Sequence, residues 1–271
     1  TIILGMVCED GIVLAADSEV TFDRGVPVKR VDVDKIFKLG NFFALAGAGV
    51  TPFVQECRDS IIMECNKLSR NGELSFSSVK VVAGEVVTGI YANHAQKMRH
   101  IGEQVSMNVT MMLAGLEMVN DKLFKNLYVL YNTGLLERAE KYATIGSGAA
   151  YAELLLGGDR KYYKDYLKVE EAAIVAYNIV REIEKVDYNV GRPVKIVKLS
   201  KNGYQCTSED KLSNPMTPEK ERTRKDLITR LDLMSMLGRL SFEDLQKTLN
   251  KGEGEESIHQ RKEARNRIRN A

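Results

Sequence analysis

The sequence predicts an α+β fold in which antiparallel sheets pack against pairs of helices. Strand-like and helix-like segments occur in separate blocks along the chain, in the order strands, two helices, strands, two helices and a closing strand pair. Segregated blocks favour antiparallel sheets over a doubly wound parallel sheet, which needs alternating elements. One arrangement that buries both sheets is a four-layer αββα sandwich, and this is the architecture that we predict, followed by a C-terminal helical extension.

The strands are predicted from short apolar runs that are separated by turn residues. Asp10-Gly11 lies between two such runs at the start of the chain, which is a strong hairpin signal, and Gly40-Asn41 and Asn202-Gly203 mark two further turns. The predicted strands cover residues 1–8, 11–16, 33–39, 41–48, 106–115, 125–132, 140–146 and 193–205.

Four helices are predicted from apolar residues that recur at helical spacing. In the first, Phe53, Cys57 and Ile61 share one face, and Thr51 is expected as the N-cap before Pro52. The predicted helices cover residues 51–70, 75–100, 148–157 and 169–186.

The character of the chain changes after Cys206. We therefore predict one domain over residues 1–205, a linker over 206–218 and a helical extension over 219–271. Thr217-Pro218 is a good helix start, and it is followed by an apolar stripe made of Leu227, Ile228, Leu231, Met234 and Leu237. Such a stripe must be buried, so we expect it at a contact between subunits. The basic end of the chain fits either a solvated helix face or a contact with RNA or an acidic partner.

Composition excludes several classes of function. The net charge is +2, which gives no argument for nucleic acid or an anionic membrane, and no run approaches the length of a membrane span. The four cysteines are scattered, which fits reduced thiols in the cytoplasm. With three histidines and no cluster at ligand spacing, we expect no metal, no cofactor and no Ser-His-Asp triad.

Thr1 is the most informative single residue, because the sequence begins with threonine and not with methionine. An N-terminal threonine carries a nucleophilic hydroxyl together with an α-amine whose reference pKa is about 8, so that the amine can accept the hydroxyl proton. We expect that a leader was removed to expose it. The alternative is ordinary methionine excision or a trimmed chain.

Six short segments, taken in order, resemble the proteasome β-subunit family of N-terminal-nucleophile hydrolases over residues 1–205. Each segment is weakly specific, but their order and separation make chance agreement improbable. The segments are Thr1, Gly11-Ile12-Val13-Leu14-Ala15-Ala16-Asp17, Asp34-Lys35-Ile36, Ala46-Gly47, Gly146-Ser147-Gly148-Ala149-Ala150-Tyr151-Ala152, and Asp187 with Gly191.

The resemblance implies a role for each matched residue. Thr1 would be the nucleophile, Lys35 would ease its proton transfer, and Asp17 would hold Lys35 charged and oriented. Gly47 would supply its backbone N–H to the oxyanion hole, where glycine allows close approach of the substrate. Ser147 and Asp187 would orient the Thr1 amine.

The resemblance also implies a substrate pocket. Its lining would be apolar, so we expect an uncharged substrate side chain next to the scissile bond. Thr21 and Gly47 would pair their main chains with an extended substrate. The pocket residues implied in this way are Val20, Val33, Phe37, Leu45 and Gly49.

Three departures from the family pattern stand out. Val190 occupies a position where the family usually has serine, which removes a hydroxyl near the Thr1 amine. Glu19 replaces a commonly basic residue, and Ile2 replaces a frequent threonine. Together with the C-terminal extension, these changes indicate a divergent prokaryotic member.

The sequence therefore predicts a threonine endopeptidase that acts on peptides or unfolded proteins, within a homo-oligomeric ring and with an ATPase unfoldase as a candidate partner. Two alternatives stay open. One is a peptide transpeptidase or ligase on the same scaffold, resembling connectase-type relatives. The other is an inactive structural β-like subunit.

Overall fold

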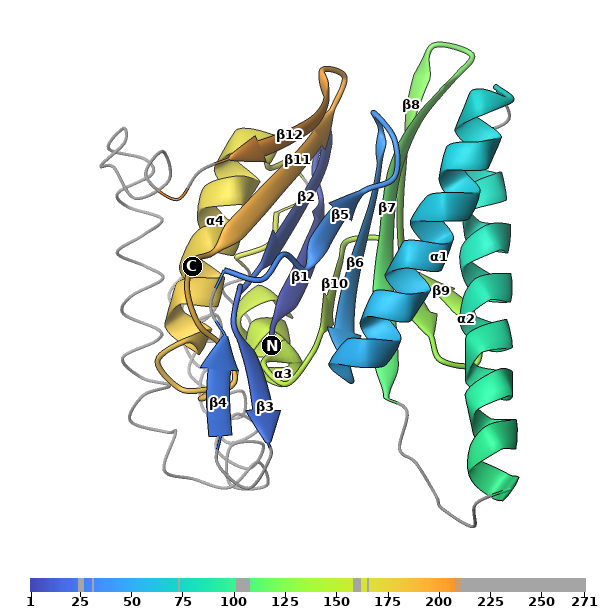
Figure 1. Cartoon of the computed structure of the whole chain (residues 1–271). Coiled ribbons are helices and arrows are strands. Elements are labelled where there is room, and N and C mark those ends of the chain that lie inside the picture. The colour runs from blue at the N-terminus through green and yellow to red at the C-terminus, as the bar shows by residue number, and fades with distance from the viewer. Residues whose placement is uncertain are drawn as a thin grey trace, which may run out of the picture. The chain divides into compact units, whose positions relative to one another are not determined.

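Two five-stranded antiparallel sheets lie face to face, and helices cover the outer face of each sheet (Figure 1). The first sheet has the strand order β10-β1-β2-β11-β12 and the second has the order β5-β6-β7-β8-β9. α3 and α4 pack on the first sheet, whereas α1 and α2 pack on the second. The predicted α+β fold and αββα sandwich are thereby confirmed.

The structure is a computed structural model, and it describes residues 1–23, 27–30, 32–72, 74–100, 108–157, 162–164, 166–207 and 209. All of these belong to the unit Thr1–Arg224, and the second unit, Lys225–Ala271, lies outside the described residues. The predicted helical extension over 219–271 also lies outside them, so it stays a prediction.

Most elements lie where the sequence predicts them. The strands of the first sheet are β1 (Ile3–Val7), β2 (Gly11–Ala16), β10 (Tyr142–Ile145), β11 (Lys195–Ser200) and β12 (Gly203–Thr207). Those of the second are β5 (Ile36–Lys38), β6 (Phe43–Gly49), β7 (Val109–Val119), β8 (Lys122–Tyr131) and β9 (Leu136–Arg138). The helices are α1 (Thr51–Arg70), α2 (Phe76–His100), α3 (Ala149–Gly157) and α4 (Val169–Ile183).

Three short strands were not predicted: β9 and the separate two-stranded sheet β3 (Val20–Asp23) and β4 (Pro27–Arg30). We also did not predict that β7 and β8 form one long hairpin. Its turn is Asn120-Asp121, whose φ angles are 49° and 60°. Positive φ is tolerated by Asn and Asp better than by most residues, which explains the turn after the fact.

The predicted N-cap of α1 is wrong. Val50 is the N-cap, and it makes no side-chain capping hydrogen bond, so Thr51 is already the first helical residue. Among the described residues, none of the helices combines the length and the apolar character needed to cross a membrane.

Alternation along the strands assigns the buried side chains of the two faces of a sheet to different layers of the core. On β6, Ala44 and Ala46 face the cluster between the two sheets, which also contains Leu14 and Met112. Leu45 faces the other cluster, between the second sheet and the helix pair α1–α2. The small alanines allow the two sheets to approach closely, and the site described below lies at one end of this contact.

Phe76, the first residue of α2, lies in the cluster between the second sheet and the helix pair α1–α2, and its substitution tests how this cluster is packed. It is 2% exposed, and its ring lies 6.0 Å from Phe43 and 5.6 Å from Tyr128, measured between ring centroids. We expect Phe76→Ala to lower the free energy of unfolding by about 3–5 kcal/mol, because it leaves a cavity in the core. Urea denaturation measures the change.

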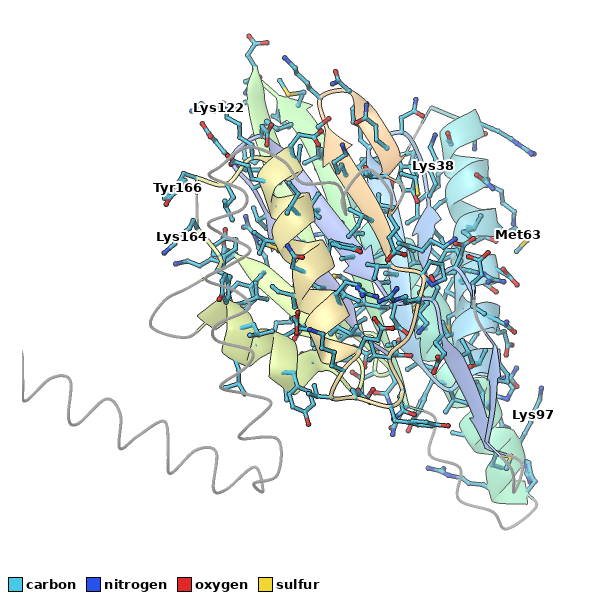
Figure 2. All side chains as sticks on the ribbon, turned by 90° about the vertical axis from the view of Figure 1, so that its left-hand side faces the viewer. Lys38, Met63, Lys97, Lys122, Lys164 and Tyr166 are labelled. Atoms are coloured by element: carbon cyan, nitrogen blue, oxygen red, sulfur yellow. The ribbon has the colours of Figure 1, made fainter. Side chains whose placement is uncertain are left out.

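Met63→Ala is the matched control. Met63 is 52% exposed and projects from the outer side of α1, away from the sheets (Figure 2). Its substitution should change the free energy of unfolding by no more than about 0.5 kcal/mol. Equal effects of the two substitutions would contradict the packing of Phe76 against the second sheet.

Candidate active site

Thr1 lies at the point where the two sheets meet, immediately before β1. It lines a cleft of about 300 Å³ together with residues from β5, β6 and α1 on one side and from the loop before α3 on the other. Among the cleft-lining residues are Lys35, Gly47 and Ser147. Segments that lie far apart in the sequence therefore converge on residue 1.

The Lys35 side chain joins Thr1 to the interior. Its Nζ atom lies 3.0 Å from Thr1 Oγ1, 2.7 Å from Asp17 Oδ1 and 2.6 Å from the Glu19 carbonyl oxygen. An ammonium has three N–H donors, so these three acceptors satisfy it. Lys35 is 5% exposed and Asp17 is fully buried, which makes this an internal ion pair aimed at the threonine hydroxyl.

Asp17 is held by the backbone around it. Its Oδ1 accepts a hydrogen bond from Ile2 N at 2.9 Å, and its Oδ2 accepts bonds from Glu19 N at 3.1 Å and Gly191 N at 3.2 Å. Backbone donors to a carboxylate stabilise its charged form. Because Ile2 is the neighbour of Thr1, the same bonds also fix the position of the N-terminus relative to Lys35.

The Thr1 amine has its own set of partners. It donates to Ser147 Oγ at 3.0 Å and to the Asn189 carbonyl oxygen. Ser147 Oγ donates in turn to Asp187 Oδ2 at 2.6 Å, and Asn189 N donates to Asp187 Oδ1 at 2.9 Å. Asp187 thus orients both groups that hold the amine.

Burial sets the protonation of this site. It lowers the pKa of the Thr1 amine below the ordinary value of 8.0, against the opposing charge of Asp17, and the Lys35 ammonium lowers it further. Burial also lowers the pKa of Lys35, against the attraction of Asp17. A lowered amine pKa increases the fraction of neutral amine near pH 7, which is the form that can accept a proton.

Gly47 is required by packing. A Cβ atom at this position would lie 2.7 Å from Val54 Cγ1 and 3.3 Å from Met111 Cε. Its backbone N–H donates to the Lys35 carbonyl oxygen at 3.2 Å. In this structure the expected oxyanion donor therefore already has an acceptor, and a substrate oxygen would have to share the hydrogen bond or replace that acceptor.

The predicted pocket residues separate into three groups. Val20, Val33, Phe37 and Gly49 line the cleft with Thr1. Leu45 does not line it, which corrects the prediction: its fully buried side chain lies in the cluster under α1 and α2, on the same face of β6 as Gly47 and Gly49 but outside the cleft lining. Thr21 belongs to β3, but its side chain lies outside the described part of the chain.

One residue of the site, Asn189, was not predicted. The Asn189 contact uses a main-chain carbonyl, which any residue type provides, so no sequence signal could have found it. Gly146 belonged to a recognised segment, and its function is now clear: φ is +101°, and a Cβ atom would lie 2.4 Å from the Thr1 carbonyl oxygen. Val190 is 3% exposed, so it fills space without offering a polar group.

Comparison with known proteins identifies a family for this chain. A model of the family described as Proteasome subunit matches residues 1–199, a range that contains every site residue named above. The chain is 25% identical to proteasome subunit beta 1 of Thermococcus kodakarensis over 218 residues, covering 79% of this chain and 95% of that protein. It is 27% identical to proteasome subunit beta 1 of Desulfurococcus amylolyticus over 202 residues, covering 74% and 90%.

The pKa of the Thr1 amine is directly testable by NMR titration of isotope-labelled Thr1. We expect a midpoint below 8.0, a lower midpoint in Asp17→Asn, and a higher midpoint in Lys35→Met, because those charges act in opposite directions. Between the lowered pKa and about 8, the unfolded chain binds the extra proton, so this group makes the fold more stable as pH rises through that window.

Asp187→Asn is the matched control, because its charge acts on the amine more weakly than that of Asp17. It should lower the midpoint by less than Asp17→Asn does. Shifts of the same sign in Asp17→Asn and Lys35→Met would indicate general disruption of the site and contradict the electrostatic account.

Proposed function

Because the chain belongs to the proteasome subunit family, we propose that it is a threonine-type endopeptidase whose nucleophile is the Thr1 hydroxyl. One observation carries the proposal: Lys35 Nζ lies 3.0 Å from Thr1 Oγ1, while the amine of the same residue is held by Ser147 and Asn189. Nucleophile, base and orienting groups thus lie within hydrogen-bond reach of one another.

In the first half of the reaction, Thr1 Oγ1 attacks the carbonyl carbon of the scissile peptide bond. The hydroxyl proton passes to the neutral Thr1 amine, directly or through a water molecule, and the Lys35 ammonium stabilises the developing alkoxide. The C–N bond then breaks as the leaving amine takes the proton from the Thr1 ammonium. The product is an ester between the substrate acyl group and Thr1.

In the second half, a water molecule attacks the ester carbonyl and gives a proton to the Thr1 amine. The C–O bond to Thr1 breaks, the carboxylic acid leaves, and the hydroxyl recovers its proton. The Gly47 N–H is the candidate donor to the oxyanion in both halves, provided that it exchanges or shares its bond to the Lys35 carbonyl.

A modification experiment tests the peptidase proposal. Protein prepared with Thr1 at its amino terminus is incubated with a peptide epoxyketone, which reacts with both the hydroxyl and the amine. Mass spectrometry should show one adduct on Thr1, and Thr1→Ala should show none. Peptide hydrolysis should fall by roughly a thousandfold or more in Thr1→Ala and also strongly in Lys35→Met.

Two other functions are outcomes of the same experiment. If products form only by transfer of the acyl group to an added amine peptide, and no hydrolysed product forms, the protein is a transpeptidase. The observation that motivates this alternative is Val190, which offers no hydroxyl beside the Thr1 amine. If Thr1 is never labelled and Thr1→Ala changes nothing, the protein is a structural subunit.

We further infer that the chain works as a homo-oligomeric ring in the cytoplasm, with an unfoldase ATPase as a candidate partner. Its family relatives are named as subunits, and the four cysteines are free thiols. The predicted C-terminal helices are candidates for the contacts between subunits.

Light scattering tests the assembly. The full chain should have a mass that is a multiple of 30.4 kDa. Leu227→Asp with Leu231→Asp, on the predicted apolar stripe, should lower that mass, because burying a carboxylate at a contact is costly. A mass of one chain at every concentration would contradict the ring, and an unchanged mass in the double variant would contradict the role of the helices.

A further inference from the structure

Arg58 is a charged residue of the cleft to which the proposed chemistry assigns no role. It extends from α1 and lines the cleft that Thr1 also lines. Its guanidinium carbon lies 4.9 Å from the centroid of the Phe37 ring, which lines the same cleft. Stacking on an aromatic face restrains the guanidinium and leaves its edge for hydrogen bonding.

The present partner of Arg58 holds it weakly. Both Nε and Nη2 lie 2.7 Å from the same oxygen, Asp59 Oδ1, and the Asp59 side chain is 65% exposed. An exposed ion pair contributes little stability. Of the five N–H donors of a guanidinium, the other three have no partner within the described residues. Arg58 can therefore donate hydrogen bonds to a second carboxylate, or release Asp59 and bind another carboxylate in its place.

Lys35 and Asp34, the other charged side chains of the cleft lining, also have partners. Lys35 is paired with the buried Asp17. Asp34 faces Lys195, whose Nζ lies 3.4 Å from Asp34 Oδ1 and 2.7 Å from Asp32 Oδ1. Of the cations that line the cleft in the described part of the chain, Arg58 is thus the one whose partner is mostly exposed to solvent.

We propose that Arg58 binds a carboxylate of the substrate, so that cleavage favours Glu or Asp at the residue whose carbonyl is attacked. The inference rests on the proposed peptidase function. It replaces the expectation of an uncharged side chain, because the fully buried Leu45 is not part of the cleft lining whereas Arg58 is. A guanidinium pairs with a carboxylate through two parallel hydrogen bonds, and such charge-assisted bonds are among the strongest in proteins.

Glu and Gln have nearly the same shape and differ in charge, so a matched pair of fluorogenic peptides isolates the interaction. The two peptides carry Glu or Gln before the scissile bond and are otherwise identical. In the unaltered protein, kcat/KM for the Glu peptide should exceed that for the Gln peptide by about tenfold or more. In Arg58→Met the ratio should fall to about one, because the charge that distinguishes the Glu peptide from the Gln peptide has lost its partner.

Methionine keeps an apolar side chain against Phe37, so the change removes charge with little loss of packing. Lys67→Met, at an exposed position on the same helix, removes a cation outside the cleft lining and should leave the ratio unchanged. A Glu-to-Gln ratio of kcat/KM near one in the unaltered protein, or an unchanged ratio in Arg58→Met, overturns the inference about Arg58. If a neutral epoxyketone still labels Thr1 in that case, the peptidase proposal keeps its support. Loss of labelling and of all cleavage overturns both.

Discussion

The buried Asp17–Lys35 ion pair is the interaction on which the rest of the site depends. Removing two charges from water is costly, and the attraction between them compensates only if every remaining donor and acceptor is satisfied. Here three backbone N–H groups hold the carboxylate, and three oxygens hold the ammonium. One of those three oxygens is Thr1 Oγ1, so satisfying the pair also positions the hydroxyl.

The fold explains why such a pair can exist at this place. Asp17 follows β2 in the first sheet and Lys35 precedes β5 in the second, and the two sheets approach closely through the alanines of β6. Thr1 precedes β1, beside β2, so it stands at the edge of the interior. The pair is therefore shielded from water on one side and reaches the cleft on the other, an arrangement that neither sheet could build alone.

The amine and the hydroxyl of Thr1 are positioned by separate networks. Lys35 and Asp17 hold the hydroxyl, whereas Ser147, Asn189 and Asp187 hold the amine. One of the groups that hold the amine is a main-chain carbonyl, that of Asn189. Main-chain groups keep their place when side chains are substituted, so this contact does not depend on the residue type at that position.

The sequence by itself determined the segregated strands and helices and the Asp10-Gly11 hairpin, because these follow from local periodicity and turn chemistry. The grouping of short segments around Thr1 was implied only by the resemblance to a known family. Only the tertiary structure decided that Leu45 is buried outside the cleft lining, that the Gly47 amide bonds to the Lys35 carbonyl, that Asn189 contacts the amine and that Arg58 stacks on Phe37. These contacts join residues that are distant in the chain, and they depend on which face of a strand or helix meets which neighbour. Periodicity shows that a residue has a buried or exposed side, but it does not name the partner.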